Sequence, residues 1–156
     1  MSRRASILLF LTAIGLLVLA QWVEATAEQQ TMSEASPLAG TEWWVEDIEQ
    51  AGVVDNVHTT IAFPGPGQVA GDGGCNRYKG SVEFDGAAVK FGPLASTMKM
   101  CPPALMDQER KFHQAMTRVV SWEVASDTGL LHLKDGEGMT LIRAWQVTRD
   151  NPSSEQ

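Results

Sequence analysis

Short runs in which apolar and polar residues alternate, separated by turn sequences, dominate the chain and predict β-strands. The first covers Trp43–Ile48, where the uneven spacing of the apolar residues indicates a β-bulge. The second covers Thr59–Phe63, with strict alternation, and ends at the sequence Pro-Gly-Pro-Gly. Further strands are predicted at residues 81–84, 87–91, 121–126, 130–134 and 139–147.

Three of the turns between these runs share one sequence feature, an Asp followed closely by a Gly. An Asp side chain bonds to its own backbone and Gly accepts a positive φ, so each turn favours a hairpin between antiparallel strands. The turns lie at residues 85–86, 127–129 and 135–138.

The segment 103–120 has the period of an amphipathic helix instead. Its apolar residues Leu105, Phe112, Met116 and Val119 fall on one face. Two consecutive prolines suit the first helical turn, where a missing N–H has no bond to lose. The predicted fold is therefore mainly β (α+β): a curled, partly closed antiparallel β-sheet, barrel-like, with one packed α-helix at about 103–120.

The N-terminal residues differ from the rest of the chain. Arg3 and Arg4 precede an apolar run that is shorter than the ~20 residues needed to span a bilayer, and an Ala-Thr-Ala sequence ends at Ala27. This order predicts a secretory signal peptide cleaved after Ala27, with an uncleaved anchor as the alternative. The predicted organisation is a cleaved signal peptide at 1–27, a linker at 28–37, the folded domain at 38–147 and a disordered tail at 148–156.

The composition is that of one globular domain with an acidic surface: 44% of residues are apolar and 20% are charged. The net charge is −7, and loss of the signal peptide, with two arginines and one glutamate, makes it −8. Without a basic patch, this charge argues against nucleic acid and anionic membranes as partners. No cysteine near the cleavage site offers a lipid attachment point. We expect a soluble monomer of the periplasm or cell envelope that is not a lipoprotein and has no stable membrane insertion after cleavage.

The glycine-rich stretch 71–80 contains Cys75, and the other cysteine of the chain, Cys101, lies just before the predicted helix. Glycines allow a positive φ and close backbone approach, so this stretch is predicted to form a tight loop. In an oxidising compartment, two cysteines favour a disulfide, which would fasten the loop. Two buried thiols are an alternative. A reactive cysteine is another, although no histidine lies near either cysteine in the sequence.

These segments together resemble the META domain, or HslJ-like, family. The matching elements are Leu38–Trp43, Gly71–Arg77 with Gly80, Phe91–Thr97, Met100–Pro102, and Glu109 with Phe112 on the helix. The resemblance implies a mainly antiparallel β domain with one helix, a heat-shock association, a frequent location in the bacterial envelope and no established enzymatic activity. The positions it marks as structural are Gly71, Gly74, Gly80, Trp43, Thr97, Pro102 and Glu109.

Four residues are candidates for contact with a ligand or partner. Three of them follow Cys75 directly and either support the loop or face a ligand. The fourth is one of two adjacent tryptophans, which on a strand point to opposite faces. The inner tryptophan is expected in the core, and the outer one in an exposed aromatic patch with Trp122 and Trp145 unless neighbouring strands cover it. The candidates are Asn76, Arg77, Tyr78 and Trp44, with Trp43 as the inner tryptophan.

Catalytic and metal-binding chemistry find little support in the sequence. The three histidines, His58, His113 and His132, do not have the spacing of metal ligands. We therefore predict no catalytic residue, no metal and no cofactor. The predicted function is a non-catalytic binding or structural role in the cell envelope, related to stress, with an unknown envelope protein or small molecule as partner. Alternatives are a carrier of small apolar ligands in a barrel-like cavity and, less favoured, an envelope enzyme using Asp72 or Glu109.

Overall fold

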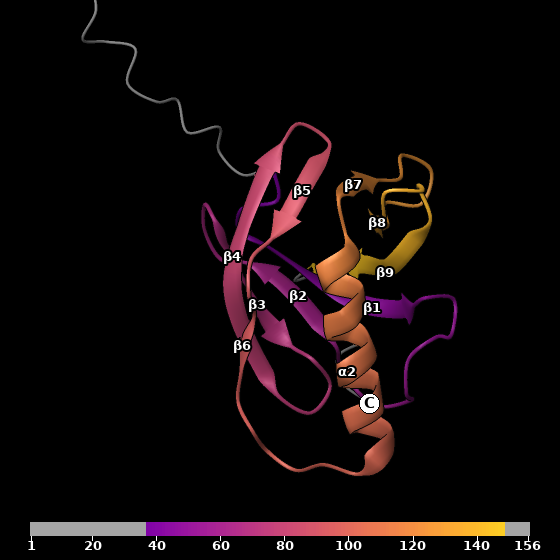
Figure 1. The fold of residues 1–156 in the computed structure, drawn as a ribbon. Coiled ribbons are helices and arrows are strands. Elements are labelled where there is room, and N and C mark those ends of the chain that lie inside the picture. The colour runs from indigo at the N-terminus through magenta and orange to yellow at the C-terminus, as the bar shows by residue number, and fades with distance from the viewer. Residues whose placement is uncertain (1–36, 149–156) are drawn as a thin grey trace, which may run out of the picture. The chain divides into compact units, whose positions relative to one another are not determined.

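The computed structural model describes residues 37–148 (Figure 1). The predicted signal peptide, nearly all of the predicted linker and nearly all of the predicted tail lie outside the described residues. The helix in the described part is too short and too polar to cross a membrane. The elements are β1 (Thr41–Ile48), β2 (Thr60–Phe63), β3 (Gln68–Asp72), β4 (Arg77–Asp85), β5 (Ala88–Phe91), β6 (Ala95–Ser96), α2 (Pro103–Arg118), β7 (Ser121–Val124), β8 (Leu131–Lys134) and β9 (Thr140–Gln146).

The strands of the described residues form one antiparallel sheet that closes on itself. The strand order is β3-β2-β1-β9-β8-β7-β5-β4-β6, and β3 also pairs with β4. The β3–β4 pairing closes eight of the strands into a ring, and β6, which pairs with β4 alone, lies outside that ring. The prediction of an antiparallel, barrel-like fold with one helix is confirmed, and the ring is complete rather than partly closed.

Two junctions of the barrel are short, β2–β3, in register only at Ala62 with Ala70, and β5–β7. Strands β5 and β7 are in register at a single pair, Ala88 with Ser121. Two backbone hydrogen bonds flank that pair, from Val89 N–H to Val120 C=O and from Trp122 N–H to Ala87 C=O, both at 3.0 Å. We call this junction the β5–β7 seam.

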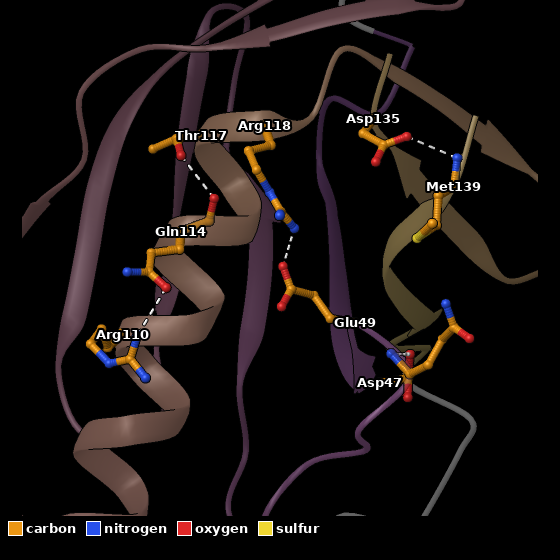
Figure 2. Close-up of polar contacts among 9 residues, drawn as sticks. Asp47, Glu49, Arg110, Gln114, Thr117, Arg118, Asp135 and Met139 are labelled. Carbon is orange, nitrogen blue, oxygen red and sulfur yellow. Dashed lines mark hydrogen bonds and ion pairs between the residues drawn. The ribbon is translucent and has the colours of Figure 1, made fainter. Parts of the chain in front are cut away.

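Strand β1 contains the predicted bulge, a register shift against β9 between Val45 and Asp47. Just beyond it, the Asp47 carboxylate accepts the N–H groups of Gln50 and Gly52 at 3.0 and 2.9 Å, which holds the turn that leaves β1. In the same turn, Glu49 forms an ion pair with Arg118 at the end of α2 (Figure 2). The turn that follows the bulge therefore contacts the end of the helix through an exposed ion pair.

Helix α2 lies against β1 and β9 (Figure 1) and follows the predicted periodicity with two exceptions. Phe112, Met116 and the following Val119 are buried as expected, whereas Leu105 is only half-buried. The unexpected buried residue is Gln108, with 6% of its surface exposed. Its amide accepts the N–H of Val54 and donates to the Thr59 hydroxyl, so a polar side chain joins the helix to the segment before β2.

The barrel interior is filled with side chains. An apolar ligand carried inside the barrel, as the carrier alternative requires, is therefore not supported. The core cluster consists of Leu38, Trp43, Val45, Ile48, Ile61, Phe63, Val69, Tyr78, Val82, Val89, Leu131, Leu133, Leu141, Ile142 and Ala144, with Phe112, Ala115, Met116 and Val119 from α2 and the segment after it.

The prediction of a loop over the whole stretch 71–80 is wrong. Its first residues belong to β3 and its last residues to β4, so only residues 73–76 connect the two strands. Gly71 serves a close approach between strands rather than a turn: a Cβ there would lie 2.1 Å from the carbonyl oxygen of Thr60 on β2. Glycine is required because the neighbouring backbone occupies the space of a side chain.

Gly71→Ala is therefore expected to lower the free energy of unfolding by roughly 2 kcal/mol, because β2 and β3 must separate to admit the methyl group. Urea denaturation followed by tryptophan fluorescence measures this change. Gly136→Ala is the matched control, since a Cβ at Gly136 meets nothing within 4 Å. Equal stabilities of the two variants would contradict the close-approach role of Gly71.

Candidate functional site

The loop between β3 and β4 is joined covalently to the start of α2. Cys75 and Cys101 form a disulfide, and the described residues contain no free cysteine. The disulfide prediction is confirmed, and the alternatives of buried or reactive thiols are set aside. Pro102, which follows Cys101, is the N-cap residue of α2, and its carbonyl accepts the N–H of Leu105 at 3.0 Å.

Glu109 of α2 holds the same loop through its carboxylate. One oxygen accepts the backbone N–H groups of Cys75 and Asn76 at 3.2 and 2.6 Å, and the other accepts the Asn76 side-chain amide at 3.1 Å. Hydrogen bonds to an ionised carboxylate are stronger than those between neutral groups. The carboxylate is thus engaged in structure, which weakens Glu109 as a candidate acid of an enzyme.

Asn76 connects the loop to the segment after β6. Its Oδ1 accepts the Thr97 hydroxyl at 2.8 Å and the Lys99 N–H at 2.7 Å. Only 6% of its surface is exposed. Of the two roles considered for Asn76, this geometry favours support of the loop, with Thr97 as its partner. Gly74, in the loop itself, has a φ of +108° that favours glycine.

Tyr78 is buried in the core rather than presented to a ligand. Its hydroxyl donates to the carbonyl oxygen of Thr60 at 2.9 Å, and 3% of its surface is exposed. Burial, assisted by the negative charge of Asp72, raises the pKa of the Tyr78 hydroxyl well above its ordinary value of 10.0.

This raised pKa predicts a loss of stability in alkaline solution. The folded protein retains the Tyr78 proton at a pH where the unfolded chain has lost it, so the free energy of unfolding falls as the pH rises above about 10. Tyr78 is the single tyrosine of the chain, so its tyrosinate absorbance can be followed directly. We expect that absorbance to appear together with unfolding. Tyrosinate formation in a protein that stays folded, or an unchanged pH dependence in Tyr78→Phe, would contradict the prediction.

On the outside of the barrel, Trp44 lies in an aromatic cluster. Its ring centroid is 4.0 Å from that of His58 and 4.9 Å from that of Trp145, the residue opposite it on β9. Both tryptophans are half-buried and His58 is exposed. Trp122 is not part of this cluster, because it packs against Phe84 and donates to the carbonyl of Gly86. Trp43 points inward and is buried, as expected.

A groove of about 440 Å³ adjoins this cluster across β1–β4. Ala70 and Gly71 contribute almost no side chain to it, whereas Glu42, Asp72 and Arg77 supply charges. Arg77 is exposed and forms no ion pair with another described residue. Since His58 belongs both to the groove and to the aromatic cluster, the two form one continuous surface, which we call the outer groove.

A second cavity, of about 400 Å³, lies between α2 and the segment that joins β5 to β6, and none of the candidate contact residues predicted from the sequence lines it. Ser96 and His113 meet in it, with 3.2 Å between Oγ and Nε2. Burial lowers the pKa of His113, and the negative charge of Glu109 opposes that effect in part. Two features of the sequence could have indicated this cavity. His113 lies at the edge of the apolar face of the helix, and the segment Phe91–Thr97 is one of those that resemble the META domain family.

Among residues 37–148, no three His, Cys, Asp or Glu side chains gather closely enough to hold a metal ion. His58 is exposed in the outer groove, and His113 lies in the second cavity. His132, on β8, lies 3.3 Å from the Thr140 hydroxyl. The structure thus places the three histidines in different surroundings.

Two solved structures are similar to this chain. One is an NMR structure of a protein from Burkholderia xenovorans, with 23% identity, a TM-score of 0.61, and coverage of 72% of this chain and 85% of the other. The second, also an NMR structure, has 21% identity, a TM-score of 0.52, and coverage of 69% and 90%. At these identities the likeness concerns the fold alone. No curated protein matches the sequence.

The comparison with protein families gives a match over the whole folded part. The META domain matches residues 36–148, which include every strand and the helix described above. The stretches that carried the resemblance in the sequence, around the disulfide and Glu109, form one connected network in the structure. The chain belongs to the META domain family.

Proposed function

We propose that this protein is a soluble, exported protein of the cell envelope that binds a ligand through the outer groove and catalyses no reaction. The observation that carries the proposal is the continuity of the Trp44 aromatic cluster with the groove lined by Glu42, Asp72 and Arg77. A role under envelope stress belongs to the same proposal and rests on the family resemblance.

The chemistry of the outer groove favours a saccharide as the ligand. Tryptophan rings offer flat apolar surface, which fits the C–H faces of a sugar ring. Carboxylates accept hydrogen bonds and a guanidinium donates them, so Glu42, Asp72 and Arg77 can satisfy the hydroxyl groups around the ring. A floor of Ala70 and Gly71 leaves room for the ring to approach the sheet.

The geometry favours binding over the enzyme alternative. Of the two candidate acids, Glu109 is occupied by the loop. Asp72 does line the outer groove, but one of its oxygens accepts the N–H of Gly74 at 2.8 Å and thereby shapes the loop. Between Ser96 and His113 there is a hydroxyl–imidazole contact, yet no described group bonds the other ring nitrogen of His113 as a hydrolytic triad requires.

An NMR titration of the purified protein with N-acetylglucosamine hexamer and with cellohexaose tests the proposal. We expect shifts of the Trp44 and Trp145 indole signals with at least one glycan. Trp44→Ala should weaken binding about 10-fold or more and Arg77→Gln about 5-fold, in the range expected for a buried aromatic contact and for a hydrogen bond. Trp122→Phe, which alters a tryptophan outside the groove, is the matched control.

Two outcomes would contradict the saccharide assignment. One is the absence of indole shifts with both glycans at millimolar concentration. The other is equal affinity of Trp44→Ala, Arg77→Gln and Trp122→Phe for the glycan that binds. If an envelope protein, and neither glycan, shifted the indole signals, the outer groove would be a binding site for a protein partner.

A further inference from the structure

Two glycines determine where the β5–β6 segment lies, and thereby leave the cavity between this segment and α2. Gly80 of β4 allows residues 93–94 to lie directly on the strand, since a Cβ at Gly80 would be 2.6 Å from Leu94 Cδ2 and 2.8 Å from the Pro93 oxygen. Gly92 has the same role, because a Cβ there would be 2.2 Å from Ser81 Oγ. The connecting segment is thus held against the barrel, and the cavity remains between it and the helix.

The lining of this cavity is apolar except at one place. Phe91, Leu94 and Met116 supply apolar surface, and Ser96 and His113 supply the polar groups. Thr117 also lines the cavity, but its hydroxyl is occupied by a 2.8 Å bond to the carbonyl of Gln114 (Figure 2). The side-chain hydrogen-bond donors available to a ligand are therefore concentrated in the Ser96–His113 pair.

The pair can satisfy a ligand in two ways. If Ser96 donates to the His113 ring, the serine oxygen retains lone pairs that accept from a ligand hydroxyl; if the ring donates, the serine O–H is left to donate. Burial favours the neutral imidazole, and the negative charge of Glu109, whose carboxylate is bonded to the loop, opposes that effect in part. A cavity with apolar walls and few polar groups at a fixed position is the usual form of a small-molecule site.

We propose that this cavity binds a compact, uncharged molecule made of one apolar ring or a short branched chain with a single hydroxyl group, which bonds to Ser96 and His113. A volume of about 400 Å³ accommodates a molecule of this size. The site is separate from the outer groove and does not depend on the function proposed for it.

Methyl NMR of the purified protein tests the site, with 4-ethylphenol, ethylbenzene and 4-ethylbenzoate as probes. Met116 lines the cavity, so its methyl signal reports on a ligand there, and the methyl group of the exposed Met139 serves as the internal control. We expect 4-ethylphenol to shift Met116 and not Met139. Ethylbenzene should bind about 5-fold more weakly because it lacks the hydroxyl, and the charged 4-ethylbenzoate more weakly still because burial penalises charge.

Two variants separate the polar contact from the cavity itself. Ser96→Ala should reduce the affinity for 4-ethylphenol to about that for ethylbenzene and leave ethylbenzene binding unchanged. Thr117→Trp, at an exposed helix position, should block both probes by filling the cavity, whereas Thr128→Trp makes the same change in the β7–β8 turn and should block neither.

The proposal is overturned by any of three results. Met116 does not shift with any probe up to its solubility limit, 4-ethylbenzoate binds best, or Ser96→Ala weakens both uncharged probes equally. Far-ultraviolet circular dichroism and urea denaturation of each variant establish that a loss of binding does not come from a loss of folding.

Discussion

Replacement of Glu109 by alanine is expected to lower the free energy of unfolding by about 4.5 kcal/mol, the lower end of what three charge-assisted hydrogen bonds contribute. The carboxylate is the shared acceptor for two backbone N–H groups and for the amide of Asn76. Without it, the buried Asn76 loses two of its hydrogen bonds, and the connection between α2 and the loop loses its polar part. Urea denaturation of the oxidised protein at neutral pH measures the change.

Two further variants make this prediction specific. Glu137→Ala removes a carboxylate from an exposed turn and should change stability by no more than about 0.5 kcal/mol. Glu109→Gln retains one oxygen acceptor but directs an NH₂ group toward other donors, so its stability should fall between those of Glu109→Ala and the original protein. If Glu109→Ala were as stable as Glu137→Ala, the carboxylate would not hold the loop.

Reduction of the disulfide is expected to lower the free energy of unfolding by about 3.5 kcal/mol through the entropy that the unfolded chain regains. Cys75 and Cys101 are 26 positions apart, so the bond closes a sizeable loop in the unfolded state. Urea denaturation with and without dithiothreitol gives the difference. The double variant Cys75→Ala/Cys101→Ala should reproduce it without reductant, and a difference below about 1 kcal/mol in both experiments would contradict a stabilising role.

The two effects should not add. Glu109 accepts the N–H of Cys75 itself, so the bond and the carboxylate hold the same loop against the same helix. Once the disulfide is open, the loop can move away from α2 and the hydrogen bonds contribute less. A combination of Glu109→Ala with reduction should therefore cost less than the sum of the separate changes.

The helix and all strands except β3 and β6 could be predicted because each follows its own period of apolar residues. Strand β3 was missed for a physical reason. Gly71, which indicated a loop, is needed where β2 and β3 approach each other, and a sequence does not distinguish these two uses of glycine. Gln108 was missed because its partners, Val54 and Thr59, lie more than 40 positions away, beyond what local periodicity can indicate.

The candidate sites were predictable to a smaller extent. Trp44 and Arg77 were predicted as separate candidates. In the barrel, His58 contacts Trp44 and also lines the groove that contains Arg77, and no spacing in the sequence predicts this. The patch expected from three tryptophans contains only two of them, because Trp122 of β7 packs against the core and Phe84 of β4 instead. The Ser96–His113 contact joins β6 to α2 across 17 positions, and only the folded chain places the two side chains in one cavity.

The β5–β7 seam has a kinetic consequence. Two backbone hydrogen bonds join the strands there, whereas the β3–β4 loop is held to α2 by the disulfide and the Glu109 carboxylate. Brief opening events, which expose amides to exchange well before the whole protein unfolds, should therefore begin at Val89 and Trp122. Since β5 ends at Phe91, a wall of the second cavity, the same events would set how quickly a small molecule enters and leaves.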